Sequence, residues 1–505
     1  MKMIRHTLSL FLITLLILPL LSCGTSELSS SPEPSADLIT VPSSEPSPAV
    51  WPEPMPESSP AARAHISFDG TILDYEYWYE EGRDRDWEED VLYLAEVYLK
   101  REPRLTEIAF TYEFNSRIIR STDEFFDQEL RESFIDAIEL LIPQISELSD
   151  TEILYEMQRI IASLDDAHSR ILLPDGARFP IKFVEMFEDD GISLYVVTMP
   201  TTEEFLLWGR LESINGMPTE DVLSRLGAYQ SSENIYGEIY DNTISYALIS
   251  SQDALAAAGV IEYDDSTAEF RVSFDDGTVL SAELSVYSAD EGWPERTDVR
   301  MLSTGSLMYE NFDLDYWMKY IPDDNMVYVR MNYVVERSDL PYLSLWEEII
   351  SMIDDAPEPP KVVFDLRGNG GGMYPIRGLD QFVDSLNNTD KEGVYVIIDN
   401  GIFSSAVALA ADFRQKIENA VLVGLPVGEP VNTFGPSSGS TGIGFGGSFH
   451  VLPNNGCNFV VSDRFYVSWP GYEGEALMPD IEVRPTIEDY KQGIDTIMEA
   501  VKDMK

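Results

Sequence analysis

Basic side chains are scarce in this chain of 505 residues. Lysine and arginine number 34 against 89 aspartates and glutamates, which gives a formal net charge of -55 at pH 7. A surface of this sign repels phosphate groups, so we expect no nucleic acid among the partners of the protein. The negative charge favours solubility and is only a weak indication of calcium or of a particular substrate.

Cysteine is rarer still, because the whole chain contains only Cys23 and Cys457. Two cysteines cannot form a disulfide framework, so a hydrophobic core must hold the fold together. The length is sufficient for two or three domains. The sequence also lacks a cluster of metal-ligating residues and a nucleotide-binding motif, and we expect neither a metal nor a cofactor.

The first residues have the pattern of a secretory signal. Lys2 and Arg5 precede an apolar run over residues 8–21, which is too short to be a comfortable transmembrane helix. The run ends in Leu20-Leu21-Ser22-Cys23-Gly24, which resembles the lipobox of bacterial lipoproteins. This resemblance implies a signal peptide over residues 1–23, lipidation of Cys23, and an extracytoplasmic protein anchored to the cell membrane. The alternative is an ordinary cleaved signal with a coincidental cysteine.

Composition divides the rest of the chain into four parts. Residues 24–63 are rich in Ser, Pro, Glu and Ala and have the composition of a semi-rigid tether. Residues 64–180 carry helical patterns at 86–101, at 125–141 and from Ser149 onward, where Ser149 and Glu152 have the spacing of a capping box. Residues 181–310 are rich in strand-like runs, and residues 311–505 form a fourth region.

The β-rich region contains strand-like runs at 192–197 and 270–274. Residues 211–218 and the helical pattern at 219–226 resemble the strand, turn and helix of a PDZ-like module. The resemblance implies that this region could hold a peptide.

Strand and helix alternate in the fourth region. Strands are predicted at 326–332, 361–366, 394–398 and 421–423, and helices at 343–353, 376–386 and 404–417. Such βαβ repeats predict an α/β fold with a mostly parallel sheet and right-handed crossovers. Functional residues in these sheets lie at the carboxyl ends of the strands, which directs attention to residues 365–372 and 399–404.

The segment Asp365-Leu366-Arg367-Gly368-Asn369-Gly370-Gly371-Gly372 places three consecutive glycines in a loop. Without Cβ atoms, the backbone N–H groups of such a loop can approach a ligand closely. A phosphate-binding loop would be followed by lysine, and none is present. The loop therefore favours binding of an oxyanion, and its alternative is a simple tight turn between a strand and a helix.

Ser404 lies at the predicted start of the next helix. Unpaired N–H groups and the positive end of the helix dipole favour a developing anion at that point. Serine is also a preferred N-cap residue, and most serines at helix starts have no other role. From the local sequence alone, the capping role is the better interpretation.

The glycine-rich segment followed by Gly401-Ile402-Phe403-Ser404-Ser405-Ala406 resembles the tail-specific, or C-terminal-processing, serine peptidase family. The resemblance implies a crotonase-like (ClpP/crotonase) core with Ser404 as the nucleophile. It also implies an oxyanion hole formed by the backbone N–H groups of Ser405 and of a glycine, Gly371 or Gly372.

Two branches of this family differ in the group that activates the serine. One branch uses a lysine about two dozen residues after the serine, but no lysine occurs here between Lys416 and Lys491. The matching segment, Gly428-Glu429-Pro430-Val431-Asn432-Thr433-Phe434-Gly435, is more similar to the tricorn-like branch, which uses histidine.

Histidine occurs four times in the chain. His6 lies in the signal, His65 adjoins the tether, and His450 has the alternating context of a packed strand residue. His168 in Leu164-Asp165-Asp166-Ala167-His168-Ser169 resembles the motif that supplies the base in the histidine branch. A capping histidine at a helix end, or His450 as the base, are the alternatives.

The third element of the family is a glutamate seven residues before a Pro-Asp-Ile aspartate, which corresponds to Glu473. Ala476 replaces the usual glycine, so Glu475 is an alternative, and Val407 stands where the family often has a glutamate. These resemblances imply a serine endopeptidase that cleaves peptides or unfolded protein tails outside the cytoplasmic membrane. The alternative is an inactive peptide-binding lipoprotein with the same fold.

Overall fold

The computed structural model describes residues 66–68, 73–106, 118–119, 125–174, 176–188, 191–288, 292–300, 306–436 and 448–504. The predicted signal and tether lie outside these ranges, and so do Cys23 and His65. Across the described ranges, no helix is long and apolar enough to cross a membrane. The domain boundaries given above stay predictions.

Three helices form the first region: α1 (Arg83–Arg101), α2 (Gln128–Leu141) and α3 (Asp150–Ala162). Helix α1 begins three residues before the predicted start at residue 86, so that Asp84 and Asp86 lie in its first turn, where negative charge is favourable. Helix α3 has the predicted capping box between Ser149 and Glu152. The short elements nearby are β1 (Ser67–Phe68), β2 (Leu73–Asp74), β3 (Ile118–Ile119), η2 (Ile142–Glu147) and β4 (Arg170–Ile171).

The middle region is built on a seven-stranded antiparallel sheet in the order β10-β9-β7-β6-β11, with β5 paired to β6 and β8 to β7. Its strands are β5 (Lys182–Glu188), β6 (Gly191–Pro200), β7 (Arg210–Ile214), β8 (Met217–Pro218), β9 (Thr267–Ser273), β10 (Val279–Ser285) and β11 (Arg296–Asp298). Its helices are η3 (Thr201–Leu206), α4 (Thr219–Gly227), α5 (Ile235–Tyr240), η4 (Asp241–Ser245), η5 (Leu248–Ser250) and α6 (Gln252–Ala257). The resemblance to a PDZ module stays a prediction.

A six-stranded sheet carries the predicted βα units, in the order β12-β13-β14-β15-β16-β21. All neighbours from β13 onward are parallel, and β12 is antiparallel to β13. The strands are β12 (Tyr316–Ile321), β13 (Met326–Met331), β14 (Lys361–Asp365), β15 (Gly393–Ile398), β16 (Ala420–Gly424) and β21 (Ile481–Glu482). The prediction of an α/β fold with a mostly parallel sheet is confirmed.

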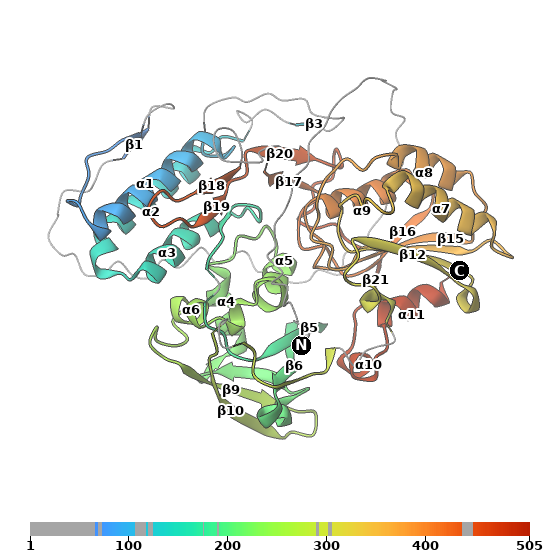
Figure 1. The fold of residues 1–505 in the computed structure, drawn as a ribbon, viewed down its shortest axis with the longest axis horizontal. Helices are drawn as coiled ribbons and strands as arrows, with labels where there is room; N and C mark the ends of the chain where they lie inside the picture. Colours follow the sequence, from blue (N-terminus) through green and yellow to red (C-terminus); the bar gives the residue numbers. More distant parts are fainter. Residues whose placement is uncertain are drawn as a thin grey trace, which may run out of the picture. The chain divides into compact units, whose positions relative to one another are not determined.

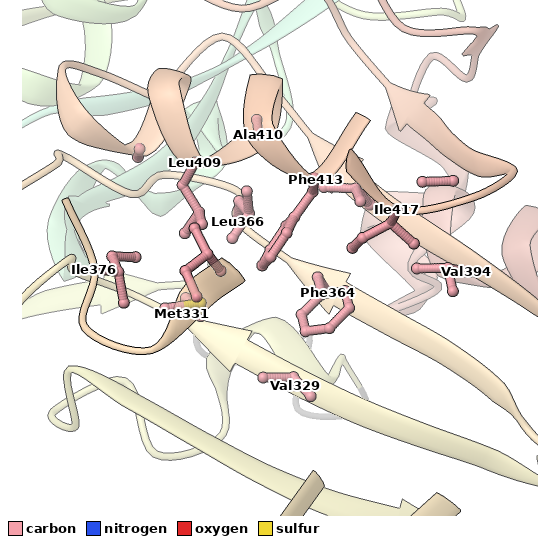
Figure 2. Packing of buried hydrophobic residues seen from close by; sticks show 14 of the residues in the cluster. Val329, Met331, Phe364, Leu366, Ile376, Val394, Leu409, Ala410, Phe413 and Ile417 are labelled. Carbon is pink, nitrogen blue, oxygen red and sulfur yellow. The ribbon is translucent and has the colours of Figure 1, made fainter. Parts of the chain in front are cut away.

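Helices cover both faces of this sheet, as Figure 1 shows. One face packs against α7 (Tyr342–Asp354), α8 (Leu379–Asn387) and α9 (Ser405–Lys416), and the other against α11 (Thr496–Asp503). Figure 2 shows Phe364 of β14 beside Phe413 of α9, and their ring centroids are 4.5 Å apart. Because α9 is buried along most of its length, its first residue is held firmly against the ends of the strands.

The last part of the chain adds small sheets that join distant segments. Strand β17 (Asn432–Gly435) pairs with β20 (Arg464–Val467), which pairs with β3. Strand β18 (Phe449–Val451) pairs with β19 (Asn458–Val460), which pairs with β4 just after His168. The remaining elements are η7 (Leu307–Tyr309), η8 (Pro322–Asp324) and α10 (Ile487–Gln492).

Candidate active site

Ser404 lies between strand β15 and helix α9, at the carboxyl end of the parallel sheet. Its backbone has φ 56° and ψ -126°, a conformation that non-glycine residues rarely adopt. Such a backbone costs about 1–3 kcal/mol, and it persists only where the surroundings impose it. Ser404 is the N-cap residue of α9 by position, but its side chain makes no capping hydrogen bond. The capping role is therefore not the one that the structure supports.

The glycine loop after β14 packs directly on Ser404. Gly371 has φ +91°, and a Cβ atom built on it would lie 2.8 Å from both the carbonyl oxygen of Phe403 and the Cβ of Ser404. The N–H of Phe403 donates to the carbonyl of Asn369 at 2.9 Å. Only glycine can adopt this positive φ without strain and leave room for Phe403 and Ser404, which explains part of the glycine-rich sequence.

The three predicted oxyanion donors differ in their hydrogen bonding. The N–H of Gly371 donates to Oδ1 of Asn369 at 2.9 Å and is therefore engaged within the loop. Within the described residues, the N–H groups of Gly372 and Ser405 have no hydrogen-bond acceptor. The N–H of Ser405 also lies at the N-terminus of α9, where the helix itself offers no acceptor. Gly372 and Ser405 are thus better placed than Gly371 to bind an anion.

His168 lies in the turn between α3 and β4. Its backbone N–H donates to Oδ1 of Asp166 at 3.1 Å, and the hydroxyl of Ser169 donates to the same carboxylate. The imidazole is nearly buried, with 9% of the side chain exposed, and its centroid lies 4.4 Å from that of the Phe403 ring. The structure therefore brings His168 next to the residue that precedes Ser404.

Glu429, in the loop between β16 and β17, joins the serine to the histidine. Its Oε1 lies 3.2 Å from Nδ1 of His168, and its Oε2 accepts the backbone N–H of Ser404. Oε1 also accepts the hydroxyl of Thr433 at 3.0 Å. One fully buried carboxyl group thus contacts both partners and is itself held in place.

The pKa values of His168 and Glu429 are shifted in opposite directions. Burial lowers the pKa of His168 to about 4, although the carboxylate of Asp166 acts in the opposite direction. Burial raises the pKa of Glu429 to about 8, against the opposing hydrogen bonds from Ser404 and Thr433. His168 is therefore neutral near pH 7, as a general base must be, and Glu429 gains its charge as the pH rises toward 8.

The structure does not bring Glu473 to the other two predicted residues. Glu473 is exposed on the rim of a hollow of about 280 Å³, and within the described residues no hydrogen bond or ion pair joins it to Ser404 or His168. Glu475 is exposed as well, and its carbonyl accepts a hydrogen bond from Asn234. The glutamate that lies beside His168 is Glu429.

His450, the alternative base, lies on β18. Its ring stacks on Phe459 with centroids 5.2 Å apart, and its Nδ1 is 3.5 Å from the hydroxyl oxygen of Tyr93. Tyr93 lies on α1, and Phe459, on β19, packs in the same core as the three helices, away from Ser404. The packed environment expected for His450 is therefore the one observed.

The charged residues at the start of the glycine-rich segment have a structural role. Asp365 is buried and contacts the guanidinium groups of Arg330 at 3.1 Å and Arg367 at 2.6 Å. Burial alone would raise its pKa, but the two guanidinium groups outweigh this effect and lower it to about 2. Arg367 also pairs with Asp495, the N-cap of α11, at 2.9 Å. This network ties the loop that carries Gly371 to strand β13 and to the start of α11.

The described residues contain no group of three His, Cys, Asp or Glu side chains that could hold a metal ion. Cys457 is not in a disulfide. The site described so far consists of a serine, a histidine, a glutamate and backbone N–H groups. This is the set of groups used for acyl transfer through a serine nucleophile.

Comparison with known proteins supports the fold. No protein-family model and no curated protein matches the chain. Among solved structures, mature CPAF complexed with lactacystin matches with a TM-score of 0.52 and 13% identity over 83% of this chain and 98% of that one. Mature CPAF alone matches with 0.52, 12% identity, and coverage of 83% and 96%. The photosystem II D1 C-terminal processing protease is also found, with a TM-score of 0.34, 10% identity, and coverage of 81% and 98%.

Proposed function

We propose that the chain is a serine peptidase of the tail-specific (C-terminal-processing) family, in its histidine-using branch, with a crotonase-like core. Ser404 is the nucleophile and His168 the general base. The observation that carries the proposal is the Glu429 carboxyl group, which contacts both the N–H of Ser404 and the imidazole of His168. The fold similarity to CPAF and the sequence motifs around Ser404 agree with it.

The groups of the site define the order of the reaction. His168 takes the proton of the Ser404 hydroxyl as Oγ attacks the peptide carbonyl. The N–H groups of Ser405 and Gly372 stabilise the oxyanion that forms. His168 then gives the proton to the departing amine, and a water molecule releases the acyl group by the same steps in reverse. Ionised Glu429, whose Oε1 lies 3.2 Å from Nδ1 of His168, stabilises the imidazolium, the role that we assign to it in place of Glu473.

Hydrolysis of casein by residues 64–505 tests this proposal. Ser404→Ala and His168→Ala should each lower the rate by about a thousandfold or more, because either change removes a group that acts at the reacting atoms. Ser351→Ala, which alters an exposed serine on α7, is the control and should leave the rate unchanged. Equal rates in all four proteins would overturn the proposal. Complete absence of hydrolysis and of labelling by a fluorophosphonate would favour the peptide-binding alternative.

We also propose that lipidated Cys23 anchors the protein to the outer face of the cytoplasmic membrane. The short apolar run and the lipobox resemblance support this location. In bacterial cells, Cys23→Ser should release the protein from the membrane fraction. Continued retention of the variant in that fraction would contradict lipidation at Cys23.

A further inference from the structure

A second carboxyl group, that of Glu233, lies behind Glu429. Glu233 belongs to the segment between α4 and α5 of the middle region. Its Oε1 is 2.7 Å from Oγ1 of Thr433, the same hydroxyl oxygen that lies 3.0 Å from Oε1 of Glu429. The chain of contacts therefore runs from Glu233 through Thr433 and Glu429 to His168.

The backbone around Glu233 is fixed against the loop that carries Glu429. The amide of Asn234 donates to the carbonyls of Val427 at 3.2 Å and Glu475 at 2.9 Å. Gly237 packs so closely that a Cβ atom built on it would lie 2.2 Å from the carbonyl oxygen of Gly428. The backbone contacts of Asn234 and Gly237 therefore hold the segment that carries Glu233 in place.

The hydrogen atoms of this group can be counted. The Thr433 hydroxyl has one proton, but its oxygen lies within hydrogen-bond distance of two carboxyl groups. It can donate to one of them only, so the other must donate its own proton to Oγ1. At least one carboxyl group of the two is therefore protonated.

The partners of each group identify the protonated one. Glu429 accepts the N–H of Ser404 and faces His168 as well as Thr433, so it is the group of the two that loses its proton more readily, as the pH rises toward 8. Within the described residues, the side chain of Glu233 has its only hydrogen-bond contact with Thr433, and its buried Oε2 has no partner. An ionised carboxylate in such a place would be costly, whereas a neutral carboxyl group is not.

The surroundings of Glu233 also favour its protonated form. Burial raises its pKa well above the usual range, and the carboxyl groups of Glu429 and Asp166 add to this effect. The hydroxyl of Thr433 and the guanidinium of Arg104 oppose it, but Arg104 is already paired with Glu102 at 2.7 Å.

We propose that Glu233 is a positioning residue that remains protonated and donates its hydrogen bond to Thr433, which turns the Thr433 hydroxyl toward Glu429. Without Glu233, that hydroxyl can turn to the carbonyl of Phe434, which lies 3.1 Å away. Glu429 would then lose a donor and hold His168 less firmly. This inference rests on the proposed function, since it assigns Glu233 to the same site.

Kinetics of three variants test the inference. Glu233→Gln keeps a neutral donor and should retain kcat within about twofold, with an unchanged pH profile. Glu233→Ala should lower kcat about tenfold at constant KM, as expected for loss of one supporting hydrogen bond. Thr433→Val should have a similar effect, and the double variant should be no worse than Thr433→Val alone, because both act through one contact. Glu238→Gln, a buried carboxyl group on α5 outside this chain of contacts, is the control and should behave as wild type.

Two kinetic results would overturn the inference. One is a Glu233→Gln variant as impaired as Glu233→Ala, since a neutral donor would then not be sufficient. The other is additive loss in the double variant, which would indicate a general structural effect of Glu233.

Titration of His168 by NMR gives a readout that needs no turnover. In the Ser404→Ala background, the signal of His168 can be assigned by its disappearance in His168→Gln. If Glu233 is neutral, Glu233→Gln should leave the pKa of His168 unchanged. If Glu233 is ionised, the substitution removes a negative charge and the pKa should fall by about one unit, which would overturn the inference. An inactive wild type with an unchanged titration would contradict the proposed function but not the protonation of Glu233.

Discussion

The two halves of the site are held by different kinds of structure. Ser404 and Gly371 follow adjacent parallel strands, and the buried helix α9 and the network around Asp365 fix them. His168 and Glu233 come from a turn and a connecting segment far earlier in the chain, and a few hydrogen bonds and one bridging carboxyl group hold them. The comparison teaches that the sheet and its helices position Ser404, whereas the groups that would activate Ser404 are held by single side chains.

The largest expected effect comes from the bridging group. Glu429→Gln preserves size but removes the charge that stabilises a protonated His168, and it should lower kcat by about a thousandfold. The substitution should change the melting temperature little, since a neutral amide fits a buried place. Measurement of kcat and of thermal unfolding checks both. Full activity of the variant would break the comparison, because His168 would then be held without Glu429.

The sheet half can be tested at the glycine loop. Gly371→Ala introduces a Cβ atom 2.8 Å from Phe403 and Ser404, and we expect about a hundredfold lower kcat from the displaced serine. Gly277→Ala is the matched control, because Gly277 also has positive φ, at +82°, but no neighbour within 4 Å of the added atom. The control should lose only about 1 kcal/mol of stability and keep its activity. Equal activity of the two variants would contradict the close packing.

Stability should fall as the pH rises from 5.5 to 8. Burial raises the pKa of Glu185 and Glu238 to about 7 and that of Asp241 and Asp399 to about 6. In this range the folded chain binds more protons than the unfolded chain, so deprotonation favours unfolding, by a few kcal/mol in all. His168, with its lowered pKa, contributes in the opposite sense but is a single group. Denaturant unfolding at each pH measures the trend.

The contribution of one carboxyl group can be isolated. Glu238→Gln should make the decline of stability with pH shallower, because the variant has one fewer group to deprotonate. An equally steep decline in the variant would show that Glu238 does not contribute. The parent trend would itself be contradicted by higher stability at pH 8 than at pH 5.5.

The smallest effect is expected at the glutamate that the sequence motif selects. Glu473→Gln should change kcat less than about twofold, because the side chain is exposed and has no bond to Ser404 or His168. A loss as large as that of Glu429→Gln would instead support the sequence-based assignment of Glu473. Comparison of Glu473→Gln with Glu429→Gln therefore decides between the glutamate that the motif selects and the glutamate that lies beside His168.

Sequence periodicity predicts the βα units well, because strands β13 and β14 are buried on both faces and helices α7 and α8 have a clear apolar stripe. It also predicted the places of Ser404 and Gly371, since these follow the strands directly. Periodicity does not single out Glu429, although Gly428-Glu429-Pro430 lies in the segment that resembles the histidine-using branch. In a chain with 89 acidic residues, a glutamate stands out only when its burial and its neighbours are known.

Local sequence patterns cannot identify Glu233 as part of the site, for a different reason. Its partner, Thr433, lies 200 positions further along the chain. No periodicity or motif encodes a contact over that separation. The side chains that tune the site were therefore the part that only the three-dimensional structure could supply.

The double contact of Glu429 has a consequence for protein engineering. Because one carboxyl group contacts the backbone of Ser404 and the ring of His168, the spacing of these two residues depends on a third side chain as well as on the elements that carry them. A designer who transplants this site to another scaffold must therefore carry over three anchored residues. The glycine loop that packs on Ser404 must be carried over with them.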